Sequence, residues 1–171
     1  LIGDNLKEKL GVIRTQELYA ARKIDGALQF FSSAKDFGFS KNPNETFSIW
    51  NRQKVLNEII KTFNFFQPDI IINRFDHRTP GTTHGHHTAS AILSIEAFNK
   101  INNFNKKNRA WAIERIFLNT SWFFYGSRKK FEELNKENLL SIDVVTYNRE
   151  KGIYNSYLSA RSRSQHKSQG F

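Results

Sequence analysis

The chain has no cysteine and no methionine among its 171 residues. Without cysteine it has no thiol nucleophile, no disulfide and no cysteine-based zinc site, so any metal must be bound by histidine and carboxylate side chains. Its 3 prolines and 9 glycines are scattered, and no linker, internal repeat or low-complexity tract is found. Because the sequence starts at Leu1 without an initiating methionine, we expect an internal segment of a longer protein.

Long apolar runs are absent as well. No stretch has the length that crossing a bilayer requires, and no signal peptide opens the chain. We therefore expect no membrane partner. Hydrophobic residues make up 39% of the chain and include 16 Phe, which is sufficient for the core of a single domain.

Positive charge exceeds negative charge, with a formal net charge of +10. Residues 1–100 carry 13 basic and 10 acidic residues, a net +3, whereas residues 101–171 carry 13 and 6, a net +7. Glu132, Glu133 and Glu137 interrupt the basic stretches of the second part, which is typical of solvated helix faces. We expect no nucleic-acid partner, and a basic nucleic-acid binder is kept as the weaker alternative.

Hydrophobic periodicity predicts alternating helices and strands. Helices are expected over residues 15–27, 42–66, 88–98, 128–135 and 155–167, and strands over 28–31, 70–73, 115–119 and 141–146. The three isoleucines at 70–72 follow Pro68 and predict a strand buried on both faces, as in parallel sheets. The order of elements predicts an α/β fold in the form of a three-layer sandwich.

Four of the five histidines lie within residues 77–87, directly after the strand at 70–73. Ligands of open α/β sheets bind at the carboxyl ends of strands, where this loop must lie. Gly81 and Gly85 are expected to let the backbone turn tightly around His84, and the spacing of three between His84 and His87 lets both rings converge on one point. Isolated surface or core histidines are the alternative interpretation.

Two common metal motifs are absent from the histidine segment. A His-x-His-x-Asp-His pattern starting at His84 would need Asp and His where the chain has Thr88 and Ala89, and no His-Glu-x-x-His pattern occurs.

Three segments together resemble a known family. Residues 81–91 (GTTHGHHTASA), 11–18 (GVIRTQEL) and 164–169 (SQHKSQ) are similar to the LmbE-like (PIG-L) zinc-dependent N-deacetylases, in particular to a large secreted branch in Bacteroidetes-type bacteria. The resemblance implies a Rossmann-like, mostly parallel sheet in a three-layer sandwich that is truncated at its N-terminus. It also implies that residues 1–171 form a single partial deacetylase domain, periplasmic or secreted.

The resemblance also implies roles for individual residues. His87 would bind the zinc ion, and His84 would be the charged catalytic acid beside the oxyanion. His86 stands where the family has Asp, so an imidazole replaces the carboxylate that would support the zinc ligands. Arg14 would contact substrate oxygens and Glu17 would orient it, although the two also fit a plain i,i+3 surface ion pair.

The family's first motif, His-Pro-Asp-Asp, supplies the other zinc ligands and the carboxylate base, and by resemblance it belongs upstream of Leu1. We therefore expect this span alone to bind little metal and to be inactive. The whole protein would use one zinc ion, or iron, to remove an acetyl group from an N-acetylated sugar or glycoconjugate. The alternative is a non-catalytic carbohydrate-binding or scaffold domain, and the sequence leaves the oligomeric state open.

The aromatic residues 122–125 would either stack on a sugar or pack in the core.

Overall fold

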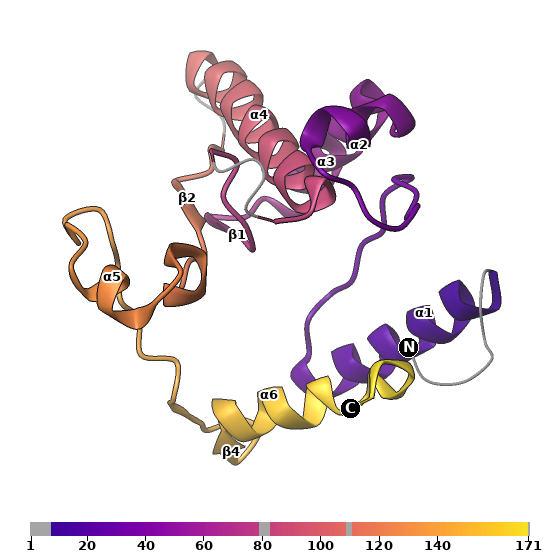
Figure 1. Cartoon of the computed structure of the whole chain (residues 1–171). Helices are drawn as coiled ribbons and strands as arrows, with labels where there is room; N and C mark the ends of the chain where they lie inside the picture. The colour runs from indigo at the N-terminus through magenta and orange to yellow at the C-terminus, as the bar shows by residue number, and fades with distance from the viewer. Residues whose placement is uncertain (1–7, 79–82, 109–110, 171) are drawn as a thin grey trace. The chain divides into compact units, whose positions relative to one another are not determined.

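The computed structural model describes residues 8–78, 83–108 and 111–170, and the chain divides into two compact units (Figure 1). The first unit combines Leu1–Phe30 with Lys136–Phe171, and the second is Phe31–Asn135. The elements of the first unit are α1 (Glu8–Asp25), β3 (Tyr147–Asn148), β4 (Ile153–Tyr154), α6 (Asn155–Arg163) and the 3-10 helix η2 (Lys167–Gln169). Those of the second are α2 (Pro43–Ile49), α3 (Arg52–Phe66), β1 (Ile70–Asn73), α4 (Gly85–Lys107), β2 (Arg115–Leu118), the 3-10 helix η1 (Trp122–Tyr125) and α5 (Arg128–Glu132). The single partial deacetylase domain over residues 1–171 stays a prediction.

The second unit contains the predicted strand-helix-strand order. β1 and β2 pair in parallel, from Ile70 opposite Arg115 to Asn73 opposite Leu118, and α4 is the connection between them. A parallel pair needs such a crossover, because the chain must return to the same end of the sheet. The second unit mixes helices and strands, which is compatible with the predicted α/β class. The two-stranded parallel sheet of the described residues is too small to establish a Rossmann-like three-layer sandwich.

The core of the second unit lies between its helices. Val55 and Leu56 of α3 pack with Leu93 and Ala97 of α4, and all four side chains are buried. α2 also packs on α4, and Figure 1 shows both shorter helices beside it. This packing fixes α4, the helix whose N-terminus carries the predicted site.

The prediction of one continuous helix over residues 42–66 is wrong, because the helix is interrupted at Trp50 and Asn51. Trp50 has extended backbone angles, and its indole donates a 2.7 Å hydrogen bond to the Lys35 carbonyl. Asn51 then starts α3, since its side chain accepts a hydrogen bond from the Lys54 backbone N–H. The asparagine cap and the tryptophan anchor together outweigh the continuous apolar periodicity.

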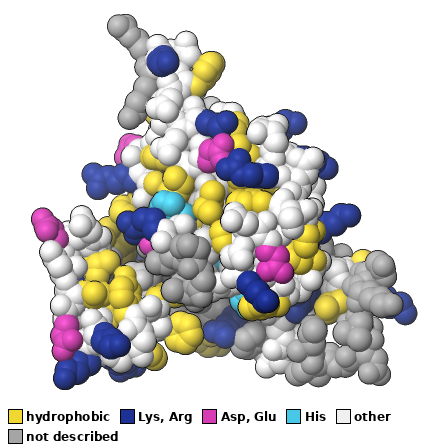
Figure 2. Space-filling model, turned by 45° about the horizontal axis from the view of Figure 1, so that its top comes forward, with side chains coloured by type: hydrophobic (Ala, Val, Ile, Leu, Met, Phe, Trp, Pro, Cys, Tyr) yellow, Lys and Arg dark blue, Asp and Glu magenta, His cyan; other side chains and the backbone are white. Residues whose placement is uncertain are grey.

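The prediction that the strand at 70–73 is buried on both faces is also wrong. Ile70 is 50% exposed and Ile72 is 66% exposed, whereas Ile71 and Asn73 are half-buried. The alternation means that the described residues cover one face of this strand only. Figure 2 shows hydrophobic side chains at the surface between Lys and Arg side chains.

Two further predicted strands are absent from the described structure. Residues 28–31 and 141–146 form no ladder, and Leu28, Ile142 and Val144 are each more than half exposed. A strand requires a neighbour that accepts and donates its backbone hydrogen bonds. The apolar patterns of these two segments are typical of strands, but a pattern within one segment does not show whether a neighbouring strand is present.

In the first unit α1 packs against α6, in agreement with the helices predicted at 15–27 and 155–167. Ala21 and Leu158 are buried there. The Ser162 hydroxyl donates a 2.7 Å hydrogen bond to Asp25, whose carboxylate also pairs with Arg22. None of the described helices has the length and apolar composition needed to cross a membrane.

Candidate functional site

The candidate site lies where the segments after β1 and β2 meet. Parallel neighbours end at the same edge of a sheet, so both following segments start there. Phe75, two residues after β1, contacts Phe124 of η1 with ring centroids 6.2 Å apart. The pKa of Arg78 is raised, first by hydrogen bonds with Asp76 and to a smaller extent by the nearby Tyr125 phenol.

His84 and His87 lie side by side at the start of α4. Their ring centroids are 5.5 Å apart with the planes at 68°. The His84 carbonyl accepts the His87 backbone N–H at 2.9 Å, so the two side chains leave the same first turn of the helix. The structure thus brings together the two residues expected to share one site, while their chemical roles stay predictions.

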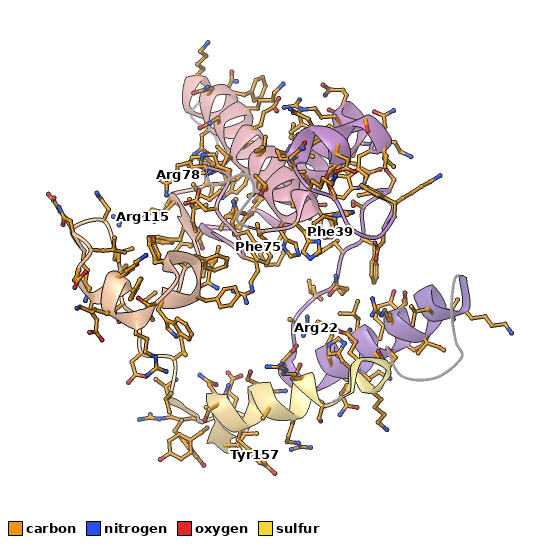
Figure 3. All side chains as sticks on the ribbon, in the orientation of Figure 1. Arg22, Phe39, Phe75, Arg78, Arg115 and Tyr157 are labelled. Atoms are coloured by element: carbon orange, nitrogen blue, oxygen red, sulfur yellow. The ribbon has the colours of Figure 1, made fainter. Side chains whose placement is uncertain are left out.

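His87 is held from two directions. The Phe75 ring, labelled in Figure 3, stacks on the imidazole at 3.8 Å between centroids with only 3° between the planes. Nδ1 of His87 and Oγ1 of Thr83 share a 2.6 Å hydrogen bond. The pKa of His87 is lowered by burial, and further by the charges of His84, His86 and Arg74. A neutral, oriented imidazole whose Nε2 is left for a ligand is the form that binds metals.

His84 is exposed, whereas His86 is set among aromatic rings. His84 meets Phe39 edge-on at 4.7 Å. His86 lies 4.4 Å from the Phe37 ring and 5.6 Å from the Trp50 ring, and its Nε2 is buried without a hydrogen-bond partner among the described residues. The observed contacts of His86 are therefore with apolar rings, and they include no hydrogen bond to His87.

Gly85 lets the start of α4 approach the backbone of residues 40–42 closely. The expected reason for this glycine, a tight turn, is therefore replaced by close packing. Its N–H donates a 2.7 Å hydrogen bond to the Ser40 carbonyl, and a Cβ on this residue would collide with the Asn42 carbonyl. Its φ is not positive, so conformational freedom is not what selects glycine. Gly81, the other glycine of the predicted turn, lies outside the described residues.

Arg14 and Glu17 belong to α1 and thus to the first unit. The Glu17 carboxylate accepts hydrogen bonds from the backbone N–H and the hydroxyl of Ser168, at 2.6 and 2.8 Å. Burial would raise the pKa of Glu17, but these bonds and the charges of His166 and Arg14 lower it. Arg14 Nε is buried without a partner in the described part of the chain. Glu17 therefore bonds Ser168 and does not form the alternative, a simple ion pair with Arg14.

His77 belongs to the predicted histidine cluster, but four neighbours were not predicted as site residues: Phe75, Asp76, Arg78 and Thr83. Asp76 accepts hydrogen bonds from the Arg78 backbone N–H at 2.8 Å and from its guanidinium at 2.7 Å, which lowers the pKa of Asp76 despite burial. Nδ1 of His77 lies 3.6 Å from the same carboxylate. Asp76 and Arg78 follow β1 closely, and this position at the carboxyl end of a strand could have identified them from the sequence. Nothing in the pattern pointed to the stacking of Phe75 or to the hydrogen bond of Thr83.

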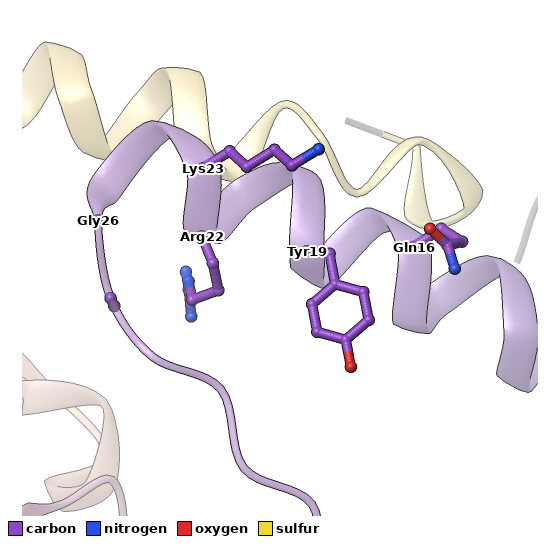
Figure 4. Close-up of a pocket in the computed structure, with 6 residues that line it drawn as sticks. Gln16, Tyr19, Arg22, Lys23 and Gly26 are labelled. Atoms are coloured by element: carbon purple, nitrogen blue, oxygen red, sulfur yellow. The ribbon is translucent and has the colours of Figure 1, made fainter.

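A separate depression lies along α1 in the first unit. Its volume is about 490 Å³, and Tyr19 and Arg22 project from the same side of the helix in Figure 4. The lining residues are Gln16, Tyr19, Arg22, Lys23, Gly26 and Ala27. The depression is open to solvent and contains none of the clustered histidines.

The donors present fit part of a zinc site. His87 meets the requirement for one ligand, because its Nδ1 is already hydrogen-bonded and its ring is oriented. Among residues 8–78, 83–108 and 111–170, no group of three or more His, Asp or Glu side chains is arranged to hold a metal ion. Zinc sites normally use at least three protein ligands, so the described residues do not complete one.

No protein-family model, curated protein or solved structure matches this chain. The likeness to LmbE-like enzymes therefore depends on the sequence segments quoted above.

Proposed function

We propose that this chain is part of a metal-dependent N-deacetylase of the LmbE-like kind, built on a Rossmann-like three-layer sandwich. Its substrate is an N-acetylated sugar or glycoconjugate. The observation that supports the proposal most directly is the pair of adjacent imidazoles, 5.5 Å apart, at the carboxyl end of a parallel strand. Sites of α/β hydrolytic chemistry lie at this edge.

His87 is the metal ligand in this proposal. Burial favours its neutral form, and Thr83 and Phe75 restrict the direction of its ring. A zinc ion there would polarise the amide carbonyl and lower the pKa of its bound water to about 7. The proposal requires two further protein ligands from outside the described residues.

His84 is the catalytic residue that stabilises the oxyanion and donates a proton to the leaving amine. It is exposed and lies next to His87, so a substrate carbonyl at the metal would come within its reach. A single positioned donor to an oxyanion contributes roughly 100- to 1,000-fold in turnover.

One observation favours a second function, a non-catalytic carbohydrate-binding or scaffold domain. The described residues form no group of three potential metal ligands. In that case the histidines would serve packing, as His86 does between Phe37 and Trp50.

Two substitutions in the full-length protein separate these functions. We expect His87→Ala to remove most of about one bound zinc per chain, measured by elemental analysis, while His84→Ala keeps the metal and loses turnover of N-acetylglucosamine derivatives by roughly 100-fold. His166→Ala, a histidine of the first unit, is the matched control and should keep its zinc. Full zinc in His87→Ala would contradict the ligand assignment, and an inactive, metal-free wild type would favour the binding domain.

A further inference from the structure

A row of aromatic rings starts at the histidine pair and continues along η1. Phe75 stacks on His87 and contacts Phe124. The Phe124 and Phe123 centroids are 5.8 Å apart, and those of Phe123 and Trp122 are 6.3 Å apart. We name Phe75, Phe124, Phe123 and Trp122 the aromatic shelf.

The outer part of the aromatic shelf is open to solvent. Phe123 is 70% exposed and Trp122 is 42% exposed, although both could have been buried at a gain in free energy. The Arg128 guanidinium lies over the Trp122 ring, 5.5 Å from its centroid, and restricts that ring. Exposed aromatic rings in a continuous row beside a candidate site mark a binding surface rather than a core.

The residues around the aromatic shelf are mainly basic. Residues 74–78 and 128–130 contain five Lys or Arg and one Asp, a formal net charge of +4. The single carboxylate, Asp76, is already hydrogen-bonded to Arg78, and a second cation, Arg74, lies over the Phe75 ring at 5.4 Å. Glu132, the last residue of the five-residue helix α5, and Glu133, directly after it, reduce the formal net charge of the region to +2. The charge therefore favours an anionic ligand.

A ligand that uses both features has flat apolar faces and negative groups at its rim. Sugar rings of an acidic glycan have this form: their C–H faces stack on aromatic rings, and their carboxylates or sulfates pair with Lys and Arg. We propose that the aromatic shelf binds sugar rings of an acidic N-acetylated glycan adjacent to the acetyl group that reaches His84 and His87. This inference rests on the proposed function, and it narrows the substrate to a negatively charged polymer.

The test is calorimetric titration of the full chain with a hyaluronan hexasaccharide and with neutral hexa-N-acetylchitohexaose. The acidic hexasaccharide is expected to bind at least tenfold more tightly at low salt, with the difference shrinking as salt screens the charges. Trp122→Ala and Phe123→Ala should each weaken binding about tenfold, while Trp122→Phe keeps a ring and most of the affinity. The control is Phe104→Ala, since Phe104 is 68% exposed on α4, about 25 Å along the helix from His87.

Four results would overturn the proposal: equal binding of the two oligosaccharides, no binding of either, an equal loss in Phe104→Ala, or binding of phosphatidylglycerol vesicles through Trp122 in place of sugar. His87→Ala distinguishes this failure from that of the proposed function. If His87→Ala keeps its zinc while Trp122→Ala loses the oligosaccharide, the assignment of His87 as the metal ligand fails and the proposal for the aromatic shelf stands. If the metal depends on His87 but no shelf variant changes binding, the shelf alone fails.

Discussion

His87 differs from the other histidines in how firmly its ring is held. Stacking on Phe75 fixes the plane of the imidazole, and the hydrogen bond with Thr83 fixes its rotation within that plane. Burial lowers the pKa of His87, and the charges of His84, His86 and Arg74 lower it further, which favours the neutral ring. A ligand fixed in this way loses little conformational entropy when a metal binds.

Removing the hydroxyl partner should therefore weaken the metal site. Thr83→Val is expected to lower zinc affinity in the full-length protein by roughly 10- to 100-fold, measured by competition with a chelating dye. Thr83→Ser keeps the hydroxyl and should restore the affinity. An affinity unchanged in Thr83→Val would mean that the hydrogen bond has no part in orienting His87.

Gly85 tests how the start of α4 is positioned. Gly85→Ala places a Cβ against the Asn42 carbonyl, where the backbone must shift, and should destabilise the protein by about 2 kcal/mol or more in urea unfolding. Gly11→Ala is the matched control, because that helical glycine has no atom within 4 Å of an added Cβ. It is expected to stabilise by up to about 1 kcal/mol. Equal effects of the two substitutions would contradict the close packing at Gly85.

At the scale of elements, α4 connects the site to the sheet at both of its ends. Its first turn carries the histidine pair, and toward its other end the buried Asn102 side chain bonds both backbone groups of Ile113, each at 2.8 Å. These two bonds fix the chain just before β2 begins. The register of the sheet and the position of the site thus depend on the same helix.

Asn102→Ala should destabilise the second unit strongly. It leaves a buried N–H and a buried carbonyl of Ile113 without partners, at a cost of about 2–4 kcal/mol. The exposed neighbour Asn103 is the control, and Asn103→Ala should change stability by less than about 0.5 kcal/mol. Chemical denaturation followed by circular dichroism measures both, and a small effect of Asn102→Ala would show that water replaces the side chain.

At the scale of the whole molecule, carboxylates join the two helices of the first unit. Asp25 bonds Ser162 of α6, and Glu17 bonds Ser168 just beyond it. Burial opposes ionisation of both groups, but their hydrogen bonds and nearby charges lower the pKa of each. A lowered folded-state pKa stabilises the fold above the unfolded-state pKa, and this contribution is lost as pH falls through the folded-state pKa.

The first unit should therefore lose stability in acid. The ordinary pKa values are 3.8 for Asp25 and 4.5 for Glu17, so the loss is expected below about pH 4. Faster hydrogen–deuterium exchange in α1 and α6 at pH 3 than at pH 5, after correction for intrinsic rates, measures it. The double variant Asp25→Asn, Glu17→Gln should flatten this dependence, whereas Glu114→Gln, exposed in the second unit, should not.

The sequence allowed the strand-helix-strand order and the place of the histidines to be predicted, because both follow from local periodicity. It did not reveal the break at Trp50, which depends on a side chain bonding a carbonyl 15 residues earlier. The exposure of Ile70 and Ile72 was missed because composition does not say which neighbours cover a strand. For the site, the i,i+3 spacing predicted the convergence of His84 and His87, but the partners Phe75 and Thr83 depend on tertiary packing.

The pairing of α1 with α6 bears on how the protein is made. Asp25 and Ser162 are 137 residues apart, so a ribosome would synthesise Ser162 roughly 7 to 27 seconds after Asp25. The second unit is continuous and is synthesised within that interval. The second unit is therefore expected to fold first during synthesis. Until α6 is made, the apolar side of α1 stays exposed and accessible to chaperones.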